Sequence, residues 1–274
     1  MGTIYQSVFH GLYFSHAIDR HPEQKSFSMH MHDQIEMYIF VSGKVRYHVE
    51  GNEYDLSPGD LLIIRQNEAH FADFLEDAPY ERYVVNFLPS LLDSIDPERR
   101  LLTPFNDRPI GCDNLYRPSD LESVSALSCA KAMCVATEDK YARRLAILSN
   151  LLPLLQGVCD SFNQRKTPET QNSIAGQITA YINEHLFEKL TVESIASHFF
   201  LSVSQIERIF KKATHASVWQ YVTSKRLTAA RVKIESGTSA YTACEECAFG
   251  DYSSFYRAYV KAYGESPVAF KKSK

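Results

Sequence analysis

The apolar and polar positions in the first part of the chain alternate in short runs that are typical of β-strands. Five such runs occupy residues 37–41, 45–49, 52–56, 61–64 and 83–87. Turn-forming residues separate several of them, namely Ser42-Gly43, Glu50-Gly51 and Ser57-Pro58-Gly59-Asp60. Short strands bounded by turn signals at this spacing predict an antiparallel β-barrel or sandwich.

Residues 119–162 change to a helical period. One side of a first helix holds Leu121, Val124, Leu127 and Cys129, and one side of a second helix holds Tyr141, Leu145, Leu148, Leu151, Leu152 and Leu155. Pro153 is expected to kink or end the second helix, because proline lacks a backbone N–H and clashes with the preceding turn. Residues 163–173 are polar and have no period, which predicts a linker.

The last hundred residues contain one helical pattern twice. Ser202, Ile206 and Phe210 recur at an offset of 49 as Asp251, Phe255 and Tyr259, whereas upstream positions such as Thr191 and Ser239 recur at an offset of 48. A repeat of this length indicates one supersecondary unit used twice, with one extra residue in the second turn.

Each copy of this pattern predicts two helices joined by a tight turn, as in a helix-turn-helix. Thr191 and Ser239 are expected to cap the first helix of each copy, and Ser202 and Asp251 the second. Gly250 is the expected permissive residue of the second turn. Between the copies, residues 217–234 predict one connecting helix with an inner side formed by Val218, Tyr221, Val222, Leu227, Ala230 and Ile234.

Residues 174–274 resemble the DNA-binding domain of the AraC/XylS transcriptional regulators. The matching positions are Leu190 to Ala196, Ser202 to Lys212, Tyr221, Arg226-Leu227, Ala230 and Phe249 to Pro267. The chain departs from that pattern at His215 and Ala248, which replace usual glycines, and at Cys244, which replaces a usual alanine. We expect some strain at His215, since histidine adopts a positive φ less readily than glycine does.

A second resemblance, to the cupin fold, covers the amino-terminal runs. It rests on His30, His32, Glu36, Gly43, Pro58-Gly59-Asp60 and His70, while Arg65 and Asn67 depart from the second cupin motif. The two resemblances imply a two-domain chain: an antiparallel β cupin-like barrel with helices, followed by an all-α tandem helix-turn-helix. The expected boundaries are 1–118 for the sensing barrel, 119–162 for a helical packing or dimerisation segment, 163–173 for the linker and 174–274 for the DNA-binding domain.

The cupin resemblance implies that His30, His32, Glu36 and His70 are the ligands wherever such a domain holds a divalent metal. Imidazoles with one carboxylate suit Zn, Fe, Mn or Ni. Hydrogen bonding to an effector and a purely structural role are the alternatives, and no other cofactor is expected. The predicted effector site comprises His30, His32, Glu36, Tyr38, Tyr47, Arg65, His70 and Tyr83. The AraC/XylS resemblance implies a carbohydrate as its ligand.

The AraC/XylS resemblance also implies which residues face DNA. The base-facing positions are Ser204, Glu207 and Arg208 in the first copy and Tyr252, Ser253, Tyr256 and Arg257 in the second. Arg208 and Arg257 are the strongest candidates, because a guanidinium can donate two hydrogen bonds to guanine. Lys211, Lys212, Lys225 and Lys261 are the expected phosphate contacts.

Charge and cysteine content refine this picture. Residues 171–274 hold 13 Lys and Arg against 9 Asp and Glu, a balance of +4, and residues 1–170 hold 16 against 24, a balance of −8. Only the basic end suits a polyanion.

The six cysteines, with no leader and no apolar run near 18 residues, predict a cytoplasmic protein with reduced thiols.

These observations predict a sequence-specific transcriptional activator that responds to a small effector and is not an enzyme. The expected partners are double-stranded DNA, the effector, a second copy of the chain and RNA polymerase, without any membrane. The alternative is a metal-dependent cupin isomerase or dioxygenase fused to a DNA-binding domain.

Overall fold

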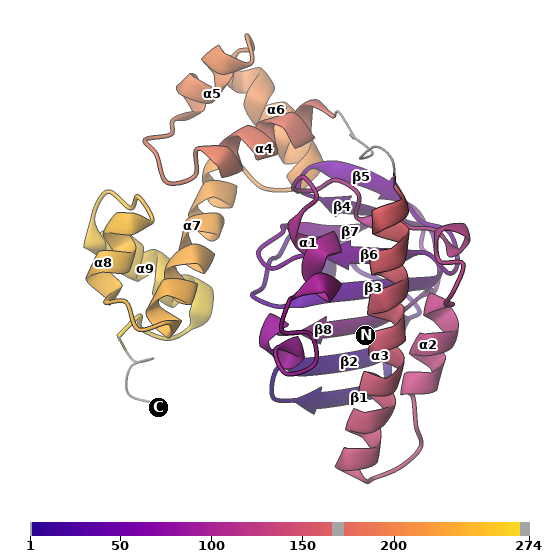
Figure 1. Cartoon of the computed structure of the whole chain (residues 1–274). Coiled ribbons are helices and arrows are strands. Elements are labelled where there is room, and N and C mark those ends of the chain that lie inside the picture. Colours follow the sequence, from indigo (N-terminus) through magenta and orange to yellow (C-terminus); the bar gives the residue numbers. More distant parts are fainter. Residues whose placement is uncertain (1, 166–172, 269–274) are drawn as a thin grey trace. The chain divides into compact units, whose positions relative to one another are not determined.

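The computed structural model describes residues 2–165 and 173–268, shown in Figure 1. These residues form two compact units, Met1–Gln171 and Asn172–Lys274. The predicted fold class is confirmed, because the first unit is built on antiparallel sheets and the second is helical.

The amino-terminal unit contains a six-stranded and a three-stranded sheet, in which all the paired strands are antiparallel. The larger sheet has the order β1 (Gly2–Phe9), β2 (Leu12–Asp19), β8 (Tyr80–Phe87), β3 (Ile35–Ser42), β6 (Leu61–Ile64) and β9 (Leu115–Tyr116). The smaller has the order β5 (Asn52–Asp55), β4 (Val45–Val49) and β7 (His70–Phe74). The five predicted runs correspond to β3, β4, β5, β6 and β8, and the sequence pattern missed β1, β2, β7 and β9.

Successive side chains of the larger sheet point to opposite faces. On β3, Ile35, Met37 and Ile39 join the apolar core on the helix side, whereas Tyr38 and Phe40 join a second core that faces the smaller sheet. Both faces of the strand are therefore buried, which explains its nearly continuous apolar sequence.

One face of the six-stranded sheet is covered by helices. In Figure 1, α3 (Lys140–Gln164) crosses the strands, with α2 (Ala126–Met133) beside it. The short α1 (Thr103–Asn106) also contacts α3. The 3-10 turns of this unit are Gln24–Phe27, Pro89–Leu92, Arg100–Leu102 and Pro118–Asp120.

The buried stripe of α3 differs from the predicted one. Tyr141 and Leu145 are exposed, with 74% and 53% of their surface accessible, whereas Ile147, Leu151, Leu154, Leu155 and Val158 are buried. The first turns of α3 therefore project past the covered face of the sheet. The predicted first helix is also shorter than expected, because α2 begins at Ala126 and leaves Leu121 and Val124 in the preceding segment.

Pro153 does not end α3, which is helical on both sides of the proline. The prediction of a helix end was wrong because Leu151, Leu154 and Leu155 on either side of the proline are all buried in the core. Tertiary packing of this kind outweighs the local cost of one missing backbone hydrogen bond.

By length and composition alone, α3 could cross a membrane, since an 18-residue window of it has a mean hydropathy of 1.4. The expectation that no such apolar run exists therefore needs correction. The apolar residues of α3 pack against the sheet and α2, which is the arrangement of a core helix.

The predicted linker, 163–173, begins too early. Helix α3 continues to Gln164, and Ser173 already caps α4 (Ile174–Glu184) by accepting a hydrogen bond from the Gly176 N–H. Residues 166–172 lie outside the described part of the chain.

The carboxy-terminal unit confirms the internal repeat. α5 (Val192–His198) and α8 (Ala240–Glu246) are related by 48 residues, and α6 (Val203–Thr214) and α9 (Tyr252–Tyr263) by 49. All four helices carry the predicted caps. Helix α7 (Val218–Glu235) connects the copies, and its predicted inner residues are all buried.

The turns of the two copies share one backbone device. Phe200 and Ala248, at equivalent positions, have φ values of 54° and 55°, and the residue after each donates its N–H to a carbonyl five positions back. Gly250 does not supply the left-handed conformation, which falls on Ala248 instead. His215 has a φ of 56°, which is the left-handed conformation in which a histidine is expected to be strained.

The packing of α3 gives a first prediction. Leu151→Ala should lower the free energy of unfolding by about 2–5 kcal/mol, because it opens a cavity in a fully buried part of the core. The matched change Leu145→Ala, at an exposed position of the same helix, should cost less than about 0.5 kcal/mol. Urea unfolding followed by circular dichroism measures both. Equal losses would contradict the observed helix orientation.

Candidate functional site

The amino-terminal unit contains a cavity of about 400 Å³ between its two sheets. Strand β2 contributes Tyr13, Ser15 and Ala17, and β8 contributes Tyr80, Arg82 and Val84, all at alternate positions. The remaining lining residues are Thr3, Phe27, Ser28, His30, Glu36, Tyr38, Tyr47 and Ala72. The alternation of the strands thus gives the sheet one face for the helices and one face for the cavity.

Four of the predicted effector residues, His30, Glu36, Tyr38 and Tyr47, line this cavity. Tyr83 does not, because it occupies the opposite parity of β8 and packs in the helix-side core, stacked on His16. Its prediction as an effector residue is therefore corrected.

Arg65 is also placed elsewhere. Its Nη2 donates to the carbonyl oxygens of Arg108, at 2.6 Å, and Pro109, at 3.1 Å. Its Nε lies 3.4 Å from the buried carboxylate of Glu68. These bonds fasten the loop after β6 to the segment before β9, so Arg65 has a structural role in place of the predicted effector contact.

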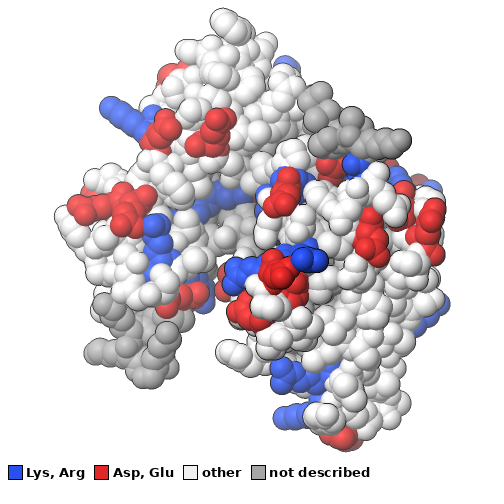
Figure 2. Space-filling model, in the orientation of Figure 1, with Lys and Arg blue, Asp and Glu red and all other residues white. Residues whose placement is uncertain are grey.

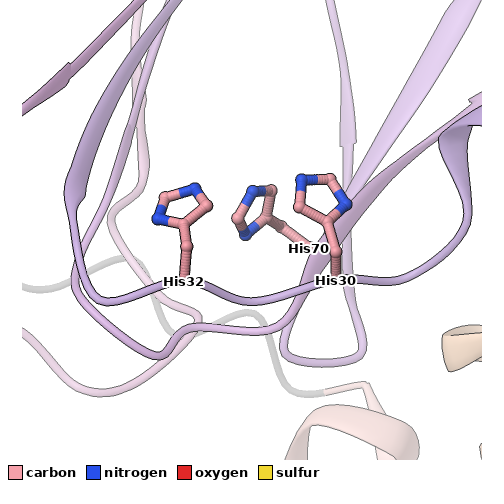
Figure 3. A group of neighbouring side chains, drawn as sticks. All are labelled: His30, His32 and His70. Carbon is pink, nitrogen blue, oxygen red and sulfur yellow. The ribbon is translucent and has the colours of Figure 1, made fainter. Parts of the chain in front are cut away.

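His32 and His70 join His30 at the edge of the cavity. Figure 3 shows the three imidazole rings on the same side of the backbone, with His70 between the other two. The isolated bridge between His30 and His70 holds the two segments together through reciprocal backbone hydrogen bonds of 3.0 and 3.1 Å.

The three rings are oriented in the same way. Each Nδ1 lies within hydrogen-bond distance of a backbone carbonyl oxygen: Ser28 for His30 at 3.0 Å, Gln34 for His32 at 3.0 Å and Glu68 for His70 at 2.7 Å. A carbonyl can only accept, so each Nδ1 carries its proton. The Nε2 atoms are left for other partners.

Glu36 lies beneath these rings and is almost completely buried. Its Oε2 lies 3.0 Å from His32 Nε2 and accepts a 3.0 Å hydrogen bond from Asn86 Nδ2, and its Oε1 accepts one from the Tyr47 hydroxyl at 3.5 Å. Burial alone would raise the pKa of Glu36, but the interactions with His32 and His70 hold that pKa well below its ordinary value.

The histidines are tuned in opposite directions. Burial lowers the pKa of His32, yet its hydrogen bond to Glu36 more than compensates, so the pKa is raised. Loss of hydration around the His30 ring, together with nearby His70, lowers the pKa of His30 to about 4. The hydrogen bond to Glu36 therefore favours the protonated form of His32, whereas the surroundings of His30 favour its neutral form.

The donor set fits a divalent metal ion. The candidate nitrogens of His30, His32 and His70 lie within 4.8 Å of one another, and His70 Nε2 is buried without a hydrogen-bond partner. Nδ1–H groups bonded to carbonyls are the usual outer support of metal-binding histidines. Zinc–nitrogen bonds of about 2.0–2.1 Å would require the three nitrogens to move closer together than they are here.

Sequence reasoning missed the other polar group of the cavity. Arg82 is buried, donates to Asp19 Oδ2 at 2.8 Å and lies over the rings of Phe27 and Tyr80 at 5.0 and 4.4 Å. The Tyr80 hydroxyl in turn lies 2.6 Å from that of Tyr38. The alternating polar positions Tyr80, Arg82 and Asn86 of β8 were the signal that could have revealed this group.

The charges of the cavity balance. The carboxylates of Asp19 and Glu36 are matched by the guanidinium of Arg82 and the protonated imidazole of His32. Both carboxylates are therefore already paired with groups of the protein.

In the carboxy-terminal unit, the predicted DNA-facing residues lie on the outer sides of α6 and α9. Ser204, Arg208, Lys211, Lys212, Ser253, Tyr256, Arg257 and Lys261 are exposed, and Glu207 and Tyr252 are half-buried. The opposite sides carry Ile206 and Phe210 or Phe255 and Tyr259, which are fully buried. Helices α6 and α9, called the reading helices below, therefore each pack against the core through one face and expose the other.

One predicted phosphate contact needs correction. Lys225 is 4% exposed and its Nζ lies 5.3 Å from the ring centroid of Tyr221. Its ammonium group is thus covered by the protein, because position 225 falls on the inner side of α7.

Charged side chains are intermingled on the visible face of both units (Figure 2). Among the coloured residues of that view, no single basic surface extends over a unit. On this face, the modest basic excess of the second unit is therefore carried by separate lysines and arginines, which suits contacts with individual phosphates.

Two family models match the chain. An AraC-like ligand-binding domain matches residues 15–155, and a helix-turn-helix domain matches residues 195–273. The first includes strands β3 to β9, most of the cavity residues and most of α3 but leaves out β1, and the second begins within α5 and includes the rest of both repeats.

Known proteins resemble the chain over nearly its full length. A probable transcriptional regulator, LumQ of Photobacterium leiognathi, is 27% identical over 248 residues, which are 90% of this chain and 93% of that protein. The transcriptional activator RhaS of Yersinia pestis is 23% identical over 92% of this chain and 91% of its own. A structure of ToxT from Vibrio cholerae matches 95% of this chain and 97% of its own with 11% identity and a TM-score of 0.40.

Proposed function

Because the chain belongs to the AraC family, and is thus a DNA-binding regulator with an amino-terminal ligand-binding domain, we propose that it activates transcription when an effector occupies the cavity between its sheets. The observation that supports this most directly is a cavity lined by polar and aromatic side chains in the same chain as two anchored reading helices.

The two repeats read DNA as a pair. The second helix of each unit, α6 or α9, enters the major groove, and a single chain can address two grooves one helical turn, roughly 34 Å, apart. Arg208 and Arg257 occupy equivalent exposed positions and donate to guanine. Lys211, Lys212 and Lys261 contact phosphates.

The effector is a small neutral polyhydroxylated molecule of the size of a sugar. A volume of about 400 Å³ suits such a ligand. Its hydroxyls can donate to Glu36 and accept from Arg82, while the rings of Tyr38 and Tyr47 provide an aromatic wall. A charged ligand would leave one of the paired groups without its partner.

The histidine group holds a divalent cation. His30, His32 and His70 would hold it through Nε2, with Glu36 as the carboxylate ligand beside them. When bound, the ion offers the effector an electrophilic centre for one of its oxygens. The chain itself fixes the orientation of the three imidazole rings, because each Nδ1–H group donates a hydrogen bond to a backbone carbonyl oxygen.

We place the chain among regulators and not among enzymes, since LumQ and RhaS are transcriptional regulators. A cupin enzyme fused to a DNA-binding domain is the second candidate, and the histidine group is the observation that favours it. Turnover of a sugar or catechol by the metal-loaded chain would support that candidate over ours.

The remaining partners follow from the exposed surfaces. Tyr141 and Leu145 on the exposed face of α3 are suited to contact a second copy of the chain. The protein acts in the cytoplasm, where its DNA and RNA polymerase are found. Its six cysteines are free thiols, which agrees with a reducing compartment.

The reading helices give a prediction about specificity. Arg208→Ala should weaken binding to the true site by about 1–3 kcal/mol and relax base preference there, whereas Lys212→Ala should weaken all duplexes alike and reduce the salt dependence. Fluorescence anisotropy with the selected site and a random duplex, at several salt concentrations, measures both. An equal effect of Arg208→Ala on the two duplexes would rule out base reading by this residue.

The cavity gives a prediction about the effector. In a panel of sugars, at least one should raise the melting temperature of the full chain. Tyr47→Phe should weaken its binding about 10-fold through the loss of one hydrogen bond. Tyr83→Phe is the matched control, since Tyr83 lies on the other face of the sheet, and should leave affinity unchanged. If both variants behaved alike, the ligand would not occupy this cavity.

The histidine group gives a prediction about metal content. The purified chain should bind one Co²⁺ with an absorption change and a rise in melting temperature, and His70→Gln should abolish both. His16→Gln, a histidine on the helix side of β2, should retain them. Retention of Co²⁺ binding by His70→Gln would contradict the assignment.

A further inference from the structure

Helix α7 holds the two helix-turn-helix units on different parts of its length. Near its start, Tyr221 packs on Phe210 of α6, with ring centroids 5.3 Å apart, and its hydroxyl accepts a 2.7 Å hydrogen bond from Asn183 of α4. Farther along, Leu227 and Ala230 belong to the apolar core of the second unit. The junction between these two regions falls at Arg226.

Arg226 is only 5% exposed and donates to three backbone carbonyl oxygens. Its Nε bonds to Leu186 and its Nη2 to Glu188, both in the segment that joins α4 to α5, and its Nη1 bonds to Ala248 in the turn between α8 and α9. All three distances are 2.8 Å. One side chain of the connecting helix therefore bonds to both units.

The chemistry of this side chain suits such a connection. A guanidinium is planar, remains charged and offers its donors in a fixed fork, so three simultaneous bonds determine the relative positions of their acceptors. Bonds with a charged donor are also stronger than those between neutral groups. A lysine could not reach three carbonyls in this geometry.

Beside Arg226, on one side of α7, a cavity separates the two helix-turn-helix units. A cavity of about 620 Å³ is lined by the segment from Phe187 to Leu190, by Trp219 and Arg226, and by the turn from Ala248 to Asp251. Apolar side chains do not fill the space between the segment before α5 and the turn between α8 and α9. At the wall of this cavity, the hydrogen bonds of Arg226 connect the segment before α5 with the turn between α8 and α9.

These bonds lie close to the start of the first motif and in the turn of the second. Glu188 is three residues before Thr191, the cap of α5, and Ala248 is three residues before Asp251, the cap of α9. A change in the position of either carbonyl would therefore move a helix-turn-helix unit relative to α7.

We propose that Arg226 is a positioning residue that fixes the distance and angle between the reading helices α6 and α9, so that the two halves of a DNA site are bound as one. This inference rests on the proposed reading of DNA by both helices. Without the three bonds, each unit still folds on its own part of α7, but binding of the first no longer places the second in its groove. The effective concentration of the second unit at its half-site is then lower.

The test uses the full chain and a duplex that the unaltered chain selects from a random-sequence library. Three forms of this duplex are compared: the selected site, the site with the half read by α9 scrambled, and the site with one base pair inserted between the halves. The half read by α9 is the one whose scrambling no longer affects binding of Arg257→Ala. The variants are Arg226→Gln and Arg226→Lys.

Arg226→Gln should reduce the affinity gained from the second half-site about 10-fold, while binding to the scrambled form stays within about 3-fold of the unaltered chain. Its affinity should also depend less on the inserted base pair. Arg226→Lys should show the same changes, because one ammonium cannot replace three directed bonds. Retained binding to the scrambled form shows that the variants are folded.

Arg231→Gln is the matched control, since Arg231 lies on the same helix, bonds to Glu235 within it at 2.8 Å, and has its contacts with Tyr263 and Glu265 in the second helix-turn-helix unit, so that these contacts do not connect the two units. It should keep the full gain from the second half-site. Equal weakening on all three duplexes, or an unchanged gain in both Arg226 variants, would overturn the positioning role. A chain that selects no sequence at all would instead overturn the reading of DNA, and the role of Arg226 with it.

Discussion

The alternation of side chains across the six-stranded sheet is the constraint on which the amino-terminal unit depends. One parity of β2, β3 and β8 supplies the apolar core beneath α2 and α3, and the other parity supplies the cavity. A shift of one residue in register would exchange the two sets and place Arg82 and Glu36 against the helices. Structure and ligand recognition are therefore specified by the same strands, and neither can change without the other.

The carboxy-terminal unit depends on a second constraint, the repeated turn. Phe200 and Ala248 adopt the same left-handed conformation, although neither is glycine, and in both turns the following residue donates its N–H to a carbonyl of the first helix. The caps at Ser202 and Asp251 then begin the reading helices. Since apolar residues anchor one face of each helix, the arginines at 208 and 257 remain available on the other.

Much of this arrangement could be predicted from the sequence, because it depends on local period and capping. The repeat, its offsets and five strands were predicted for that reason, whereas β1 and β2 lack a clear alternation of apolar residues. The site was harder to predict. His30, Glu36, Tyr38 and Tyr47 were placed in the cavity correctly, but Tyr83 and Arg65 were not, since the parity of β8 and the partners of a loop arginine are tertiary facts. The same holds for Arg82, whose partner Asp19 is 63 positions away.

The central claim is that the cavity and the reading helices are coupled within one regulator. The most direct measurement is a binding cycle: affinity for the selected duplex with and without the sugar that stabilises the chain, and affinity for that sugar with and without the duplex. Our account predicts that both ratios are equal and lie at about 5- to 150-fold, because coupling between two sites is reciprocal. A sugar that binds in the cavity and leaves DNA affinity unchanged would contradict it.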